Sequence, residues 1–189
     1  MKLIKIIIPC LLLNACLFGT SKNAKFYTLM PVSNQVVSTS YKGSVGVTRL
    51  QFPKYIARPQ IVTQTKDSAQ VNISEYNRWV EAPDVLATRV LIEDLSKLLP
   101  GAQVQENRVK ESSFETVVVV EIIQMNAVLG EQVGVSAWYT IQDRNGKIQT
   151  REKFEGSLQI GKTYDDLAKG FSQLLANLSQ DIASKLAAQ

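Results

Sequence analysis

The sequence predicts a single α+β domain, a sandwich of a largely antiparallel or mixed sheet with two main helices. Residues 83–99 and 163–186 repeat apolar side chains at the spacing of one helix face. Between them, residues 114–160 are rich in β-branched residues and contain the hairpin signal Asn145-Gly146. Two helices packed on such a sheet give the α+β class.

Residues 1–15 have the pattern of an export signal. Lys2 and Lys5 provide a charged start, and the apolar run 6–13 has eight residues with Pro9 among them. A helix needs about 20 apolar residues to span a bilayer, whereas an export signal needs only about 7–15. We therefore expect residues 1–15 to be removed as a signal peptide.

The segment LNAC, residues 13–16, resembles the lipobox of bacterial lipoproteins. In that family the cysteine thiol is alkylated by a diacylglyceryl group, and cleavage leaves the modified cysteine as the N-terminus. Asn14 departs from the pattern, because a small residue is commoner there. We expect Cys16 to be lipidated; ordinary signal cleavage after Ala15, which would release a soluble secreted protein, is the alternative.

Cys10 is expected to leave with the signal, because Pro9 stands where a lipobox needs a small residue. The mature chain then keeps Cys16 alone and forms no internal disulfide, so its stability must come from a hydrophobic core. Residues 16–25 are the lipidated N-terminus and tether, and residues 26–189 form one periplasmic domain. Leu17 follows the cysteine in place of the Asp that retains enteric lipoproteins at the inner membrane, which implies the outer membrane by resemblance.

The tether is short, because the nine residues 17–25 reach about 30 Å at most when extended. Beyond it, strands are predicted at residues 25–29 and 43–50, followed by a strand pair at 59–65 and 69–74 with a turn at 66–68. No Gly/Ser-rich or charged run divides the chain further.

The helix at residues 83–99 begins with two favourable residues. Pro83 suits a first helical turn, and Asp84 lies at the positive end of the helix dipole. Pro100-Gly101 ends the helix.

Residues 114–125 are apolar at both alternating positions, which predicts a central strand covered on both faces. A strand at 133–142 turns at 145–146 into 147–160, which has one solvated face. The last helix opens at Thr163 with Asp166 three residues later, the pattern of a capping box.

The composition offers little for catalysis. The chain has no histidine, which removes the commonest general base near neutral pH and the usual catalytic triads and zinc sites. We expect no enzyme activity, no metal and no cofactor other than the covalent lipid. The 21 basic side chains are interspersed with 17 acidic ones, so no nucleic-acid partner is expected. An envelope hydrolase that uses Asp or Ser is the enzymatic alternative.

A cluster of bulky and amphipathic residues is the candidate partner-binding surface. Such residues are frequent anchors of protein contacts. The cluster comprises Tyr55, Arg58, Pro59, Arg78 and Trp79. Pro59 favours an extended Arg58, which directs the guanidinium group. Alternatively, Trp79 and its neighbour Tyr76 plug the base of the helix that begins near Pro83.

The phrases FYTL, YIARPQIV and NRWVEAPDVLATRVLIEDLSKLL carry a family resemblance. With them the chain is similar to the ABC-type transport auxiliary lipoproteins, the PqiC/YmbA family that includes paraquat-inducible protein C. The resemblance covers most of the mature chain and is densest over residues 52–99.

This resemblance implies a component of a lipid transport system between the two membranes. Its implied partners are a periplasmic protein with mammalian-cell-entry (MCE) domains, the associated inner-membrane permease and the lipid of the outer membrane. The lipoprotein would dock the MCE assembly at the outer membrane. MCE assemblies are rings, so a homo-oligomer is compatible with this role, through an open strand edge or the face bearing Trp138. The alternative is an independent carrier that holds an acyl chain between sheet and helices, which would require a continuous apolar cavity.

Overall fold

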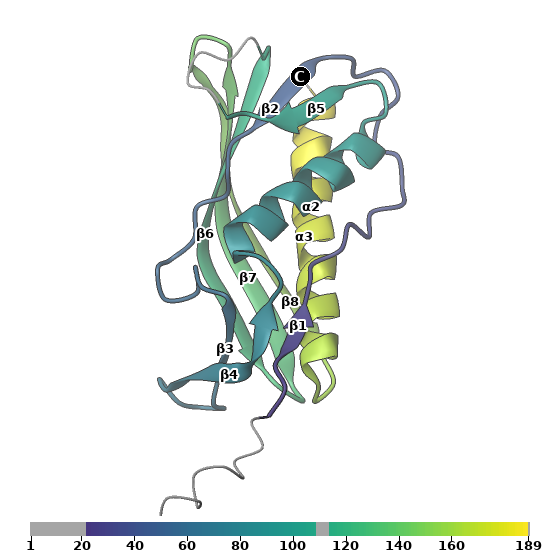
Figure 1. Cartoon of the computed structure of the whole chain (residues 1–189). Coiled ribbons are helices and arrows are strands. Elements are labelled where there is room, and N and C mark those ends of the chain that lie inside the picture. The colour runs from purple at the N-terminus through teal and green to yellow at the C-terminus, as the bar shows by residue number, and fades with distance from the viewer. Residues whose placement is uncertain (1–21, 109–113, 189) are drawn as a thin grey trace, which may run out of the picture.

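The computed structural model describes residues 22–108 and 114–188. Figure 1 shows two helices beside a long twisted sheet, with a smaller sheet at one end. The elements are β1 (Lys25–Tyr27), β2 (Ser44–Val47), β3 (Gln60–Gln64), β4 (Val71–Trp79), α2 (Pro83–Leu98), β5 (Gln103–Glu106), β6 (Thr116–Val128), β7 (Gln132–Asp143), β8 (Ile148–Gln159) and α3 (Tyr164–Ala187).

The larger sheet has the strand order β5-β2-β6-β7-β8. Strands β6, β7 and β8 form an antiparallel meander, whereas β2 runs parallel to both β5 and β6. The predicted hairpin between β7 and β8 is present, and Gly146 takes the positive φ of 78° that its turn requires. The prediction of a mixed, largely antiparallel sheet with two helices is therefore confirmed.

The smaller sheet has the order β1-β4-β3. Strand β4 pairs antiparallel with β3 and parallel with β1, the first strand of the described chain. The described part of the chain therefore begins at this sheet, at the lower end of the molecule in Figure 1.

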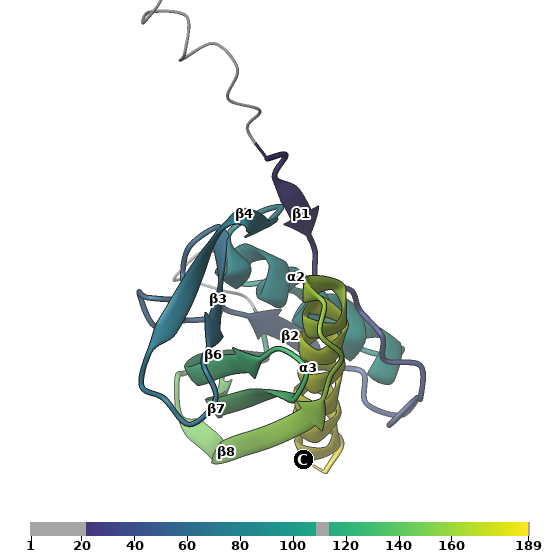
Figure 2. The same cartoon turned by 90° about the horizontal axis from the view of Figure 1, so that it is seen from below.

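The hydrophobic core lies between the sheet and the helices. Helix α3 packs on β7 and β8, and α2 packs on α3; Figure 2 shows α3 along one side of the successive strands β6, β7 and β8. Helix α3 begins with the predicted capping box, because the side chains of Thr163 and Asp166 each accept a backbone N–H bond from the other residue. Tyr139 is fully buried, and its hydroxyl lies 3.0 Å from Asp181 Oδ2.

The prediction that the strand at residues 114–125 is covered on both faces is wrong. Val118 and Val120 are fully buried, but Val117 and Val119 on the other face are only partly buried, and Ile123 is 43% exposed. The physical reason is that the packing contacts of α3 with β7 and β8 cover one side of this sheet only. The second apolar face of β6 is thus left uncovered by the helices.

Candidate docking surfaces

The predicted lipidation residue, Cys16, lies outside the described residues. Lys22, the first described residue, stands six positions after it. From Lys22 the chain leads directly into β1 of the small sheet. Cys16 thus precedes β1 by nine positions in the sequence.

Four of the five predicted partner-binding residues meet where β4 ends beside the start of β3. The backbone N–H of Trp79 donates a 2.6 Å hydrogen bond to the carbonyl oxygen of Pro59. Next to this bond, Arg78 is paired in register with Gln60. Arg58 precedes this contact directly in the chain, so the fold does bring Arg58, Pro59, Arg78 and Trp79 together.

Trp79 belongs to the core, since it is only 5% exposed. It lines, with Ile56, Ile61 and Phe171, an apolar space of about 10 Å³. Pro83, the first residue of α2, borders the same space, so the position of Trp79 agrees with the alternative that it closes the base of this helix. A side chain so placed offers almost no surface to a partner.

The other residues of the cluster differ in exposure. Tyr55, in the segment between β2 and β3, is 43% exposed, and Pro59 is exposed. Arg58 and Arg78 are partly buried. The Nε atom of Arg58 is buried and has no hydrogen-bond partner among the described residues. Tyr55 and Pro59 are thus the members that present the most surface.

The small sheet has an exposed apolar face that was not predicted from the sequence. Phe26 is 63% exposed, Val80 54% and Tyr76 46%. The sequence indicates part of this face, because residues 76, 78 and 80 occupy alternate positions of a strand, on the side opposite to Trp79. The position of Phe26 beside them depends on the parallel pairing of β1 with β4, which no local pattern predicts.

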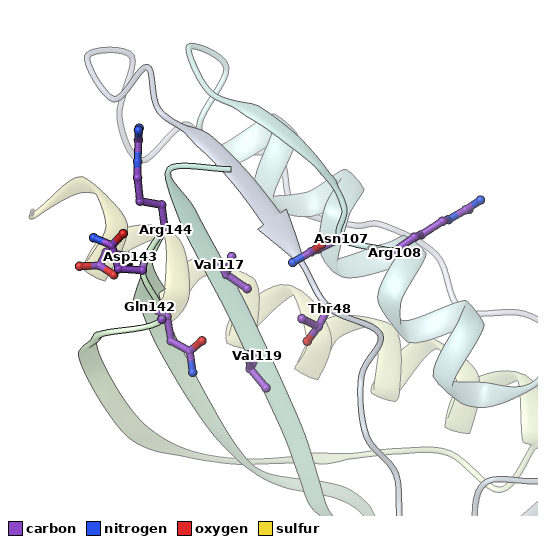
Figure 3. Close-up of a pocket in the computed structure, with 10 residues that line it drawn as sticks. Thr48, Asn107, Arg108, Val117, Val119, Gln142, Asp143 and Arg144 are labelled. Atoms are coloured by element: carbon purple, nitrogen blue, oxygen red, sulfur yellow. Dashed lines mark hydrogen bonds between the residues drawn. The ribbon is translucent and has the colours of Figure 1, made fainter. Parts of the chain in front are cut away.

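A polar pocket of about 440 Å³ lies at the opposite end of the molecule, where β6 begins and β7 turns into β8 (Figure 3). Val117 and Val119 form its apolar wall, and Arg108 and Arg144 lie at its two sides. The Oδ1 atom of Asn107 is buried there without a hydrogen-bond partner among the described residues. An extended or polar segment of a partner could therefore find both apolar contact and hydrogen bonding in this pocket.

Two charged side chains of this pocket, those of Asp143 and Arg108, are already engaged. Asp143 Oδ1 accepts hydrogen bonds from the backbone N–H groups of Asn145 and Lys147, at 2.8 and 3.0 Å, which closes the hairpin turn. Arg108 Nε donates a 2.7 Å hydrogen bond to Glu106, and this bond is the main reason that the pKa of the Glu106 carboxyl lies below its usual range. Asp143 thus serves the turn, and Arg108 is paired with Glu106.

A metal site requires a particular arrangement of acidic or other ligating side chains. Within residues 22–108 and 114–188, no group of three or more Asp, Glu, His or Cys side chains is arranged to hold a metal ion. Of the described carboxylates, only that of Asp143 lines the polar pocket, and it serves the turn. In the same described ranges, neither helix combines the length and apolar character that crossing a bilayer requires.

The family model of the ABC-type transport auxiliary lipoprotein component matches residues 27–183. This match runs from the end of β1 into α3 and so covers nearly all of the folded domain. The resemblance predicted from the sequence phrases is confirmed. Among curated protein sequences, none matches the chain significantly.

Two solved structures share the fold. The crystal structure of an uncharacterised protein superposes with a TM-score of 0.73 at 24% identity, and the alignment covers 87% of this chain and 99% of that one. A protein from Xanthomonas campestris superposes with a TM-score of 0.66 at 8% identity, over 85% of this chain and 94% of the other. At these identities the likeness concerns the fold alone.

Proposed function

Because the chain belongs to the family of ABC-type transport auxiliary lipoprotein components, we propose that it is a non-enzymatic outer-membrane lipoprotein that docks a periplasmic MCE assembly. Lipid on Cys16 holds it to the outer membrane, and the MCE protein and its inner-membrane permease complete a lipid transport system. The observation that carries this proposal is the separation of two ends, the small sheet that contains the first described strand and the polar pocket at the far end (Figure 1).

The separation suits a protein that bridges a membrane and a partner. The tether from Cys16 fixes the small sheet close to the bilayer, since residues 17–25 reach about 30 Å at most. The hairpin between β7 and β8 and the adjoining polar pocket then point away from that membrane, toward the periplasm. A partner that spans the periplasm would meet this end first.

The pocket end offers a surface that can recognise a polar partner segment. The guanidinium of Arg144 is 3.8 Å from Glu115 Oε1, and both side chains are largely exposed. An exposed pair at this distance contributes little to stability, about 0–1 kcal/mol, so Arg144 is available to exchange its partner. Tyr55 and Pro59, which are exposed on the segment before β3, are a second proposed contact, whereas the buried Trp79 is not.

The alternative of a lipid carrier receives no support from the interior. The apolar space beside Trp79 and Phe171 is about 10 Å³, which is about the volume needed for one water molecule and far less than an acyl chain occupies. Leu91, Leu95 and Leu174 are fully buried in the core between the helices and the sheet. A filled core favours a docking role.

Self-association is also part of the proposal, because MCE assemblies are rings. Strand β8 is an edge of the larger sheet, and the adjacent open face holds Trp138 with the Arg151 guanidinium 5.4 Å from its ring centre. An open edge of twelve residues can pair with a second chain. We propose this edge and face as the self-contact.

In-cell cross-linking of the tagged, membrane-anchored protein, followed by mass spectrometry, tests the proposed function. The expected result is recovery of an MCE-domain protein, with cross-links at the pocket end or near Tyr55. The exposed Lys147 beside the pocket and Lys54 beside Tyr55 provide reactive amines, and the exposed Lys169 on α3 is the control position. Recovery of only self-links and co-purified lipid would contradict docking and support an independent lipid-binding lipoprotein.

A further inference from the structure

We infer that the outer face of the small sheet lies directly on the lipid headgroup surface of the membrane to which the chain is anchored. The face consists of Phe26, Tyr76, Arg78 and Val80, and is called the outer face below. The inference rests on the proposed function only for the anchor at Cys16. It adds a second membrane contact that fixes the orientation of the domain.

The register of the small sheet places these residues on one face. Phe26 is directly opposite Arg78 in the parallel pair of β1 and β4. Val80 is two positions from Arg78, and alternate residues of an extended chain point to the same side. Tyr76 lies where the register of β3 with β4 shifts, and its ring is placed beside this face by its contact with Lys22. The backbone N–H of Val80 donates a 2.8 Å hydrogen bond to the carbonyl oxygen of Tyr27, so the extended pairing continues to this residue.

The opposite face of the same strands is the one that joins the core. Trp79 is 5% exposed, and the Tyr27 hydroxyl donates a 3.0 Å hydrogen bond to Asn77 Oδ1 on that side. The apolar residues of the outer face therefore cannot be explained by packing within the domain. Phe26, with 63% of its surface exposed, is the most exposed of the large apolar side chains that the structure describes.

The mixture of side chains on the outer face fits a membrane–water interface. Aromatic residues favour the headgroup level of a bilayer, and lysine or arginine beside them can contact anionic lipid. The Lys22 ammonium group lies 5.9 Å from the centre of the Tyr76 ring, and Arg78 is paired in register with Phe26. The nearby carboxylate of Glu81 is bound by Arg89 at 2.7 Å, which offsets its charge.

The length of the tether limits what can cover the outer face. Lys22 is both the residue beside Tyr76 and the sixth residue after Cys16. Six extended residues reach about 20 Å, so acylation of Cys16 holds the outer face within that distance of the bilayer surface. An apolar and basic face held so close to anionic headgroups has the membrane as its nearest complementary surface.

Fluorescence quenching on vesicles tests the inference with the full mature lipoprotein. Acylation consumes the thiol of Cys16, so single cysteines introduced as Phe26→Cys, Val80→Cys and Ile148→Cys can each hold a bimane label. Ile148 is the matched control, because it is 52% exposed and lies at the start of β8, at the opposite end of the molecule. The vesicles contain phosphatidylethanolamine and phosphatidylglycerol with brominated acyl chains.

The expected result is severalfold stronger quenching by brominated lipid at positions 26 and 80 than at position 148. Equal quenching at all three positions, with the protein still floating with the vesicles, would overturn the inference and leave the anchor intact. A label at position 26 that is shielded from aqueous iodide but unaffected by brominated lipid would also overturn it, because a second copy or the preceding residues would then cover the face. Failure of the protein to float would overturn the anchor and the inference together. Because two positions of the outer face are labelled, the test remains valid if one of the two substituted proteins fails to fold.

Discussion

The hydroxyl group of Tyr27 donates a 3.0 Å hydrogen bond to Oδ1 of Asn77, and this bond joins the first strand to β4 on the core side of the small sheet. Because neighbouring residues of a strand point to opposite faces, it also directs Phe26 outward. The ring of Tyr27 adds a second contact, with its centre 6.0 Å from that of Tyr164 at the start of α3. The position of β1 relative to the rest of the domain thus depends on Tyr27.

Tyr27→Phe is expected to lower the free energy of unfolding by about 1 kcal/mol. The substitution keeps the ring contact with Tyr164 but leaves the partly buried Asn77 acceptor without its donor. Urea unfolding followed by circular dichroism measures the change. Tyr55→Phe is the matched control, because Tyr55 is exposed, and its loss of a hydroxyl should change stability little. Equal effects of the two substitutions would contradict the role of the hydrogen bond.

Trp79→Ala is expected to destabilise the domain by about 3–5 kcal/mol, because it removes a large buried ring and leaves a cavity beside Phe171. Thermal unfolding measures this loss. Tyr76→Ala, three residues earlier on the exposed face, should cost much less. A variant of Trp79 that keeps its stability but loses a partner would restore the partner-binding role predicted from the sequence.

Asp94→Asn is expected to change the pH dependence of stability. Asp94 is fully buried; its Oδ1 accepts a 2.9 Å hydrogen bond from the backbone N–H of Ser33, and burial raises the pKa of its carboxyl above the usual range. Because the pKa of Asp94 is raised in the folded state, this carboxyl group stabilises the fold most at pH values below its unfolded pKa of about 4. The stabilisation is lost as the pH rises through the folded pKa.

The free energy of unfolding of the native protein, minus that of Asp94→Asn, should therefore fall as the pH rises from about 4 toward neutrality. Urea unfolding at a series of pH values gives this difference directly. Asp165, an exposed residue at the start of α3, supplies the control Asp165→Asn. A difference for Asp94→Asn that grows with pH would contradict the assignment.

Cys16→Ser is expected to abolish attachment to the outer membrane, because serine lacks the thiol that acylation requires. An unprocessed precursor or a soluble periplasmic form should appear in fractionated cells, while the folded domain keeps its thermal stability. Cys10→Ser is the matched control and should leave attachment unchanged. A Cys16→Ser protein that still fractionates with the outer membrane would show that the protein is not a lipoprotein of the expected kind.

The sequence predicts the local elements of this fold well. Pro83 occupies the first turn of α2, and Thr163 and Asp166 form both bonds of the capping box. The hairpin at Asn145-Gly146 is also where it was expected. Each of these features depends on residues within a few positions of one another, so the local sequence is sufficient to predict it.

The features that the sequence did not predict depend on contacts between distant segments. The exposure of Phe26 follows from the pairing of β1 with β4, about fifty residues later in the chain. Gly170 is another case, because a helix interior favours alanine, yet a Cβ atom there would lie only 2.7 Å from Val133 Cγ2. Likewise, Trp79 and Tyr76 become distinguishable as buried and exposed only when β4 is known to extend to residue 79.

Site-specific photo-cross-linking in cells is the measurement that tests the proposed docking function most directly. A photoreactive residue replaces Arg144 at the pocket end or Tyr76 on the outer face, and the cross-linked proteins are identified by mass spectrometry. We predict that position 144 captures an MCE-domain protein and that position 76 captures none. Capture of that protein at position 76 alone, or at neither position when the lipoprotein is correctly anchored, would contradict the proposed docking at the pocket end.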